Sequence, residues 1–289
     1  MSDAFIHHFS FAPDGLRLYW REYGAGHAST PVVCLPGLTR TTEDFDVLAR
    51  RLARDGRRVL VLDYRGRGLS DFDKDWTRYN LQTEGADILA VLRAANVARA
   101  IFIGTSRGGL HIMGLAAVVP HMLAGAVLND VGPVVETAGL LRIKSYVGKW
   151  PTPRDWHEAV AVLKRTMSAQ FPGLDHAQWE TYARMTFAER EGALTIRYDP
   201  ALMKTLDAIT PDMPPIELWP LYDALKQTPL MILRGENSDL LSEKTLAEMA
   251  MRRPDARLYK APGEGHAPLL IDAAAIDAIA GFVRGIKGE

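Results

Sequence analysis

The segment best suited to chemistry is Gly104-Thr105-Ser106-Arg107-Gly108. An apolar run precedes it at residues 100–103, and a run of helix-forming residues follows it at 110–118. A strand, a sharp turn and a helix form the context in which a Gly-x-Ser-x-Gly sequence presents a serine hydroxyl as a nucleophile. The two glycines remove Cβ atoms where strand and helix approach closely. The helix N-terminus offers free N–H groups to a developing oxyanion.

The elements that must position Ser106 are predicted from hydrophobic periodicity. Short apolar runs alternate with patterns of helical spacing through residue 130, and the alternation resumes near residue 230. This pattern predicts an α/β fold with a mostly parallel sheet of about eight strands and helices on both faces. The predicted strands are 5–10, 16–22, 32–35, 59–62, 100–103, 124–130, 230–233 and 256–259. The first two are predicted to form an antiparallel hairpin around Pro13-Asp14-Gly15.

The alternation breaks between residues 134 and 215, where no strand is predicted. This stretch has helical character, is interrupted by prolines and carries Trp150, Trp156 and Trp179. We interpret residues 134–213 as a helical cap inserted into an α/β core made of residues 1–133 and 214–289. We expect the cap to pack over the carboxyl edge of the sheet and to shape an apolar pocket over Ser106.

Several polar residues follow strand ends and should meet at one edge of a parallel sheet. Ser106 follows one predicted strand, Asp130 the next, Asp239 a later one, and His266 the last. His266 could take the proton of the Ser106 hydroxyl and then pass it to a leaving group. A carboxylate could hold the imidazole in the required tautomer. Asp239 is our predicted acid, and Asp130 is the alternative.

Three motifs and one acid carry a resemblance to a known family. They are Gly-Thr-Ser-Arg-Gly, Asp-Tyr-Arg-Gly-Arg-Gly-Leu-Ser-Asp at 63–71, Gly-His-Ala-Pro at 265–268, and Asp239. Together they resemble capped α/β-hydrolases of the esterase and ring-cleavage-product hydrolase kinds, over nearly the full chain. The resemblance implies Ser106 as nucleophile, His266 as base and Asp239 as acid. It implies an oxyanion hole made by the backbone N–H groups of Leu38 and Arg107.

Two positions depart from the family pattern. Pro36-Gly37 stands where relatives usually have His-Gly, but the glycine that permits the turn is retained. Arg107 follows the nucleophile where many relatives have methionine. Its long cationic side chain could bind a substrate carboxylate or form a structural ion pair, and we favour the ion pair.

The predicted function is a serine hydrolase acting on a small carboxylic ester or lactone, an apolar molecule with a carbonyl. One alternative is hydrolysis of a carbon–carbon bond in a diketo acid, with the same triad. Another is a slow-turnover receptor for a small ligand. No cofactor and no metal are predicted, because the histidines lack metal-site spacing and the chain lacks phosphate-loop and dinucleotide glycine patterns.

Composition indicates which kinds of partner and which compartment to expect. The formal net charge of −1 gives no electrostatic reason to bind nucleic acid or an anionic membrane. No apolar run approaches the length of a membrane span, and no signal peptide is recognisable, so we expect a cytoplasmic protein. The single cysteine, Cys34, lies in a predicted buried strand. The oligomeric state is not indicated by the sequence.

Overall fold

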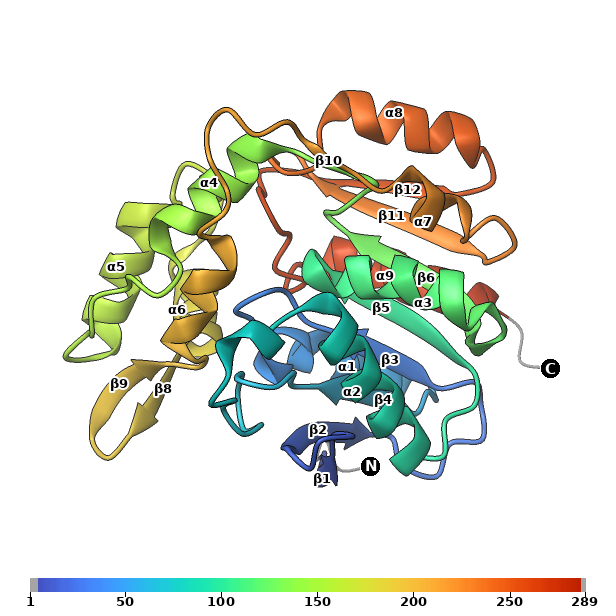
Figure 1. The fold of residues 1–289 in the computed structure, drawn as a ribbon, viewed down its shortest axis with the longest axis horizontal. Helices are drawn as coiled ribbons and strands as arrows, with labels where there is room; N and C mark the ends of the chain where they lie inside the picture. The colour runs from blue at the N-terminus through green and yellow to red at the C-terminus, as the bar shows by residue number, and fades with distance from the viewer. Residues whose placement is uncertain (1–4, 287–289) are drawn as a thin grey trace.

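The apolar runs of the sequence form one central sheet, which lies beside a largely helical layer (Figure 1). The computed structural model describes residues 5–286. The sheet has eight strands in the order β1-β2-β4-β3-β5-β6-β11-β12. Its strands are β1 (Ile6–Phe11), β2 (Arg17–Tyr23), β3 (Val32–Leu35), β4 (Val59–Leu62), β5 (Ala100–Thr105), β6 (Leu123–Asn129), β11 (Leu230–Gly235) and β12 (Arg257–Ala261).

The strand pairing confirms the predicted fold class. The strands from β4 to β12 in the sheet order pair in parallel, whereas β1 pairs with β2, and β2 with β4, in antiparallel fashion. The first hairpin is therefore confirmed, with Ile6 opposite Glu22. Because the parallel strands all end at the same edge, residues that follow β5, β6, β11 and β12 lie close together.

Helices cover both faces of the sheet. The α-helices are α1 (Asp46–Arg54), α2 (Leu81–Ala94), α3 (Arg107–Val118), α4 (Thr137–Tyr146), α5 (Trp156–Met167), α6 (His176–Thr186), α7 (Trp219–Asp223), α8 (Glu243–Arg252) and α9 (Ala273–Gly285). Short 3₁₀ turns are Thr42–Phe45, Trp76–Arg78, Pro120–Met122 and Pro200–Leu206. Ser242 caps α8, with its hydroxyl accepting the Thr245 N–H.

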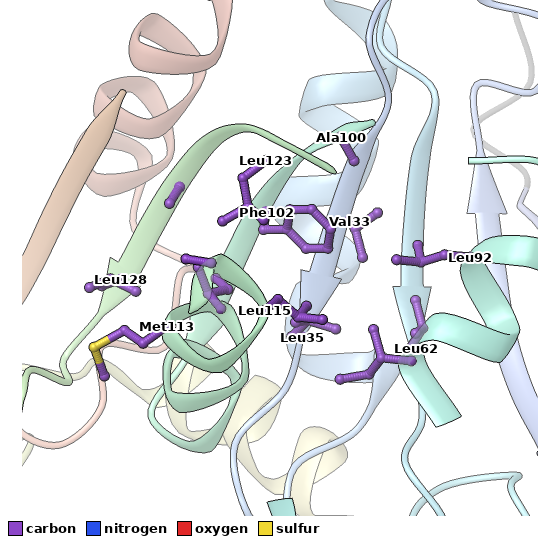
Figure 2. Packing of buried hydrophobic residues seen from close by; sticks show 14 of the residues in the cluster. Val33, Leu35, Leu62, Leu92, Ala100, Phe102, Met113, Leu115, Leu123 and Leu128 are labelled. Carbon is purple, nitrogen blue, oxygen red and sulfur yellow. The ribbon is translucent and has the colours of Figure 1, made fainter. Parts of the chain in front are cut away.

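Side chains of each central strand alternate between two hydrophobic cores. Val33 packs in the core under α2 and α3, and its neighbour Val32 packs in the core under α1 and α9. Figure 2 shows the first of these cores, in which Phe102 of β5 lies close to Val33 and Leu123. With both faces covered, β3 to β6 carry almost no exposed side chain, which explains their continuous apolar sequences.

The segment between β6 and β11 contains α4, α5 and α6, which stand beside the strand ends in Figure 1. The prediction that this segment has no strand is wrong. β8 (Phe187–Arg190) and β9 (Ala193–Ile196) form an antiparallel hairpin, and β7 (Val134–Val135) pairs with β10 (Ile216–Glu217). Glu191 and Gly192 connect β8 to β9, both with positive φ. They form a two-residue turn of the kind that hairpins prefer.

Candidate active site

Ser106 lies in the tight turn between β5 and α3. Its φ of 52° and ψ of −112° place a non-glycine residue in a strained conformation, which is held by the packing around it. The flanking glycines make this turn possible. A Cβ at Gly104 would lie 2.4 Å from the backbone carbon of Gly108, and a Cβ at Gly108 would lie 2.0 Å from the Leu35 oxygen. The predicted role of the two glycines therefore matches their contacts.

His266 lies between Ser106 and a carboxylate. Its Nε2 is 2.9 Å from the Ser106 hydroxyl oxygen, and its Nδ1 is 2.8 Å from Oδ2 of Asp130. With the ring proton on Nδ1, the imidazole donates to Asp130 and accepts from Ser106. This arrangement allows a proton to leave the serine hydroxyl as the hydroxyl attacks a carbonyl.

Asp130 is fixed from three directions. It follows β6 directly, with a φ of 58°, and is fully buried. Its Oδ1 accepts the backbone N–H of Gly235 (2.8 Å), and its Oδ2 accepts the Ser238 hydroxyl (2.6 Å). These two donors turn the carboxylate toward the third, His266.

Contrary to the prediction, Asp239 does not pair with His266, whose Nδ1 lies against Asp130. The Asp239 carboxylate instead pairs with Arg142 of α4, at 2.5 Å from Nε and 2.8 Å from Nη2. Ser238, the residue before it, has the hydroxyl that reaches Asp130. The loop after β11 thus supports the acid of the neighbouring strand, and Asp239 links this loop to α4.

The predicted oxyanion loop lies against the nucleophile. A Cβ at Gly37 would lie 3.8 Å from that of Ser106, and Leu38 lines the same cavities as Ser106. Two buried side chains hold the loop by its carbonyls. Tyr64 donates to the Pro36 oxygen (3.1 Å), and Nε of Arg67 donates to the Leu38 oxygen (2.9 Å). The roles of the Leu38 and Arg107 N–H groups stay a prediction.

The Arg107 side chain forms a buried ion pair, which is the interpretation favoured from the sequence. Its Nε lies 2.6 Å from Oε2 of Glu84 in α2, and Oε1 of Glu84 lies 2.6 Å from Nη1 of Arg67. His111 of α3 lies 3.1 Å from the same carboxylate. Burial alone would raise the pKa of Glu84, but the charges of Arg107 and Arg67 outweigh burial and hold that pKa well below its usual range.

Two cavities meet at Ser106, and both are lined partly by Leu38 and Ile143. The smaller, of about 70 Å³, also contains His266 and Arg40 in its wall. The larger, of about 410 Å³, is lined mainly by apolar side chains: Leu38, Trp76, Leu81, Leu110, Val131, Val135, Leu140, Ile143, Leu206 and Leu240. Residues from the segment between β6 and β11 line both cavities and so cover Ser106.

Several residues that support this site were not singled out from the sequence. Glu84 lies in an ordinary helical pattern, and Gln170 follows α5, far from Ser106 along the chain. The Gln170 side-chain oxygen accepts the backbone N–H of His266 (2.8 Å), and a Cβ at Gly265 would lie 2.1 Å from it. No local pattern in the sequence pointed to either residue.

Comparisons with known proteins show the family of the chain. Residues 30–273 match the family described as alpha/beta hydrolase fold. The chain belongs to this family. It is 33% identical over 282 residues to the 3-hydroxybutyrate-oligomer hydrolase of Cupriavidus necator, covering 95% of each chain. It is 27% identical over 247 residues to the 2-(acetamidomethylene)succinate hydrolase of Mesorhizobium japonicum, covering 85% of this chain and 84% of that one.

A solved structure also resembles the whole chain. The crystal structure of an alpha/beta hydrolase from Novosphingobium aromaticivorans superposes with a TM-score of 0.91 at 41% identity, covering 98% of this chain and 99% of that one. Within residues 5–286, no helix is long and apolar enough to cross a membrane. Across the same residues, no group of three or more His, Cys, Asp or Glu side chains is arranged to hold a metal ion.

Proposed function

We propose that this α/β-hydrolase is a serine hydrolase that cleaves a small carboxylic ester or lactone through an acyl-enzyme on Ser106. The observation that carries the proposal is the continuous relay from the Ser106 hydroxyl through His266 to Asp130. Asp130 takes the role of the acid in this proposal. The relative from Cupriavidus necator supports the bond type, because an oligomer of 3-hydroxybutyrate is joined by carboxylic ester bonds.

The reaction would begin with attack of Ser106 Oγ on the ester carbonyl carbon, while its proton passes to Nε2 of His266. The carbonyl oxygen becomes an oxyanion, and the backbone N–H groups of Leu38 and Arg107 are proposed to bind it. When the tetrahedral intermediate collapses, the imidazolium of His266 gives its proton to the departing alcohol. Asp130 stabilises that imidazolium through Nδ1.

The second half would release the acid. A water molecule loses its proton to His266 and attacks the acyl carbon, and Ser106 leaves with the proton returned by the imidazolium. The product carboxylic acid ionises, and the enzyme regains its starting state. Neither half requires an oxidant, a reductant or a metal ion in this scheme.

The test is labelling by a fluorescent fluorophosphonate, together with hydrolysis of short p-nitrophenyl esters. We expect the wild-type protein to be labelled and Ser106→Ala to lose both labelling and turnover. Ser168→Ala, an exposed serine at the end of α5, is the matched control and should behave as wild type. Turnover that persists in pure Ser106→Ala would refute the proposal.

Two other outcomes would favour one of the alternative functions over ester hydrolysis. Labelling of Ser106 with turnover of a ring-cleavage diketo acid, but not of esters, would favour carbon–carbon bond hydrolysis. A folded wild-type protein that is neither labelled nor active would favour a ligand-binding role.

A further inference from the structure

The smaller cavity has a polar wall that the ester chemistry does not use. Arg40 and Tyr182 both line it, together with Ser106 and His266. The Arg40 guanidinium lies over the Tyr182 ring, 4.8 Å from its centre. Arg40 follows the oxyanion loop, and Tyr182 lies on α6, so two separate elements bring these groups to the same cavity.

Part of the Arg40 guanidinium is engaged. Its Nε and Nη2 pair with the Asp44 carboxylate, and Nη2 also lies 3.8 Å from the sulfur of Met185. Among the residues that the structure describes, none hydrogen-bonds to its Nη1, which carries two N–H donors. The Nη1 group of Arg40 can therefore donate a hydrogen bond to a further acceptor in the cavity.

Tyr182 offers a second donor. The residue is 3% exposed, and no hydrogen bond of its hydroxyl is found within residues 5–286. The hydroxyl oxygen is not one of the fully buried polar atoms, so it is open to the cavity and can donate to an acceptor group of a ligand there. The phenol is a donor at neutral pH, because burial raises the pKa of Tyr182 to about 12.

Two arginines and two carboxylates lie around the cavity, each arginine paired with one carboxylate, so a bound anion would share Arg40 with Asp44. The charges of Arg142 and Arg40 both act on the phenol of Tyr146, which lines the same cavity. Asp44 opposes them, but burial raises its pKa against the lowering effect of Arg40. Asp239 is the other carboxylate near these groups, and it already pairs with Arg142 in both of its oxygens.

We propose that the smaller cavity is a carboxylate subsite, in which Arg40 Nη1 and the Tyr182 hydroxyl bind an anionic group of the substrate. The inference rests on the proposed function and specifies its substrate class: an ester whose short acyl or alcohol part ends in a carboxylate. At about 70 Å³ this cavity is the smaller of the two, which favours a short part of the substrate there. The larger apolar cavity would take the remaining part of the substrate.

The two relatives have names that agree with this substrate class. A 3-hydroxybutyrate oligomer ends in a carboxylate, and a succinate carries two. These names describe those proteins; in this chain, Arg40 and Tyr182 are the residues that could bind a carboxylate.

The experiment compares kcat/KM for matched esters that differ in one terminal group. One pair is mono-p-nitrophenyl glutarate and p-nitrophenyl pentanoate, with the carboxylate on the acyl side. The other is 4-acetoxybenzoate and phenyl acetate, with the carboxylate on the alcohol side. The enzyme-free rate of each ester is subtracted. We expect wild-type protein to prefer the carboxylated member of one pair by at least about tenfold, as charge-assisted recognition allows.

Three variants test the carboxylate subsite: two should lower the preference for carboxylated esters, and one should raise it. Arg40→Gln should lower kcat/KM for the carboxylated ester more than for the uncharged ester and so reduce the preference to about one, and Tyr182→Phe should reduce the preference in part. Asp44→Asn should increase the preference, because it frees the Nε edge of Arg40 and removes a competing negative charge. Arg165→Gln, in an exposed arginine of α5 outside the cavity, is the matched control.

The outcomes separate this inference from the proposed function. If all esters are hydrolysed by a labelled Ser106 but carboxylated and uncharged members react equally, the subsite is refuted and the serine hydrolase stands. If Arg40→Gln slows both members of a pair alike, Arg40 is structural and the subsite is also refuted. If Arg40→Gln does not fold, Tyr182→Phe and Asp44→Asn decide the result. Absence of labelling in wild type would contradict the proposed function itself.

Discussion

At the scale of single residues, two aspartates follow neighbouring strands, and the structure places Asp130 against His266. Asp130 comes immediately after β6 and turns inward in a left-handed conformation, which aspartate tolerates better than most residues. Asp239 comes four positions after the end of β11, and its carboxylate pairs with Arg142. The choice between them depends on contacts with Gly235 and Ser238, which are distant from Asp130 in sequence.

Substitution of the two aspartates should therefore have unequal effects. Asp130→Asn is expected to lower kcat on the order of 10³- to 10⁴-fold, because the amide cannot hold the same tautomer of His266 or stabilise its cation. Asp239→Asn should lower kcat less than about threefold, since it removes an ion pair that is partly exposed. Steady-state ester hydrolysis measures both. A larger loss in Asp239→Asn than in Asp130→Asn would contradict the assignment of Asp130.

At the scale of elements, the two proposed oxyanion donors come from different parts of the fold. Leu38 lies in the loop after β3, and Arg107 begins α3. Glu84 of α2 joins them: it pairs with the side chain of Arg107 and with Arg67, which in turn donates to the Leu38 carbonyl. One buried carboxylate thus connects the loop after β3 to the start of α3, the two elements that are proposed to form the oxyanion hole.

This network predicts a positioning role for Glu84. Glu84→Gln should lower kcat by about 10- to 100-fold and leave KM nearly unchanged, because a displaced oxyanion donor weakens binding of the transition state more than binding of the substrate. Glu248→Gln, at a partly exposed residue of α8 that pairs with Arg252, is the matched control and should leave kcat unchanged. Thermal unfolding of both variants checks that the protein is folded. If Glu84→Gln raises KM and lowers the thermal stability but leaves kcat unchanged, the role of Glu84 is purely structural.

At the scale of the whole molecule, features that follow from a periodic sequence pattern were predictable. Features that depend on contacts between residues distant in sequence were not. The alternation of Val32 and Val33 between two cores follows from strand geometry, so the sheet was predictable. The proximity of Ser106 and His266 was also predictable, because the ends of parallel strands share an edge of the sheet. The β8–β9 hairpin was missed, because its turn, Glu191-Gly192, lacks the Asn or Asp that usually precedes glycine in a two-residue hairpin turn. Gln170 and Glu84 could not be found this way, because no local pattern places them near Ser106.

The stability of the whole molecule should depend on pH through Glu264, which lies in the loop that carries His266. This side chain is 7% exposed, and its carboxyl accepts the Leu269 N–H (2.7 Å). Burial raises the pKa of Glu264 from 4.5 to about 7, with smaller contributions from Asp272 and Asp130. Between these two values the folded protein binds more protons than the unfolded chain, so the free energy of unfolding falls as pH rises.

Glu264→Gln isolates this effect, because the amide keeps the acceptor for Leu269 and cannot ionise. The wild-type protein should lose up to about 3 kcal/mol of unfolding free energy between pH 4.5 and 7 through this group, and the variant should not. Asp63, whose pKa burial also raises to about 7, titrates in both proteins and cancels in the difference. Urea unfolding at pH 5 and pH 8 measures it. The variant should gain stability relative to wild type at pH 8, and a difference that is the same at both pH values would show that Glu264 is ionised throughout in the folded protein.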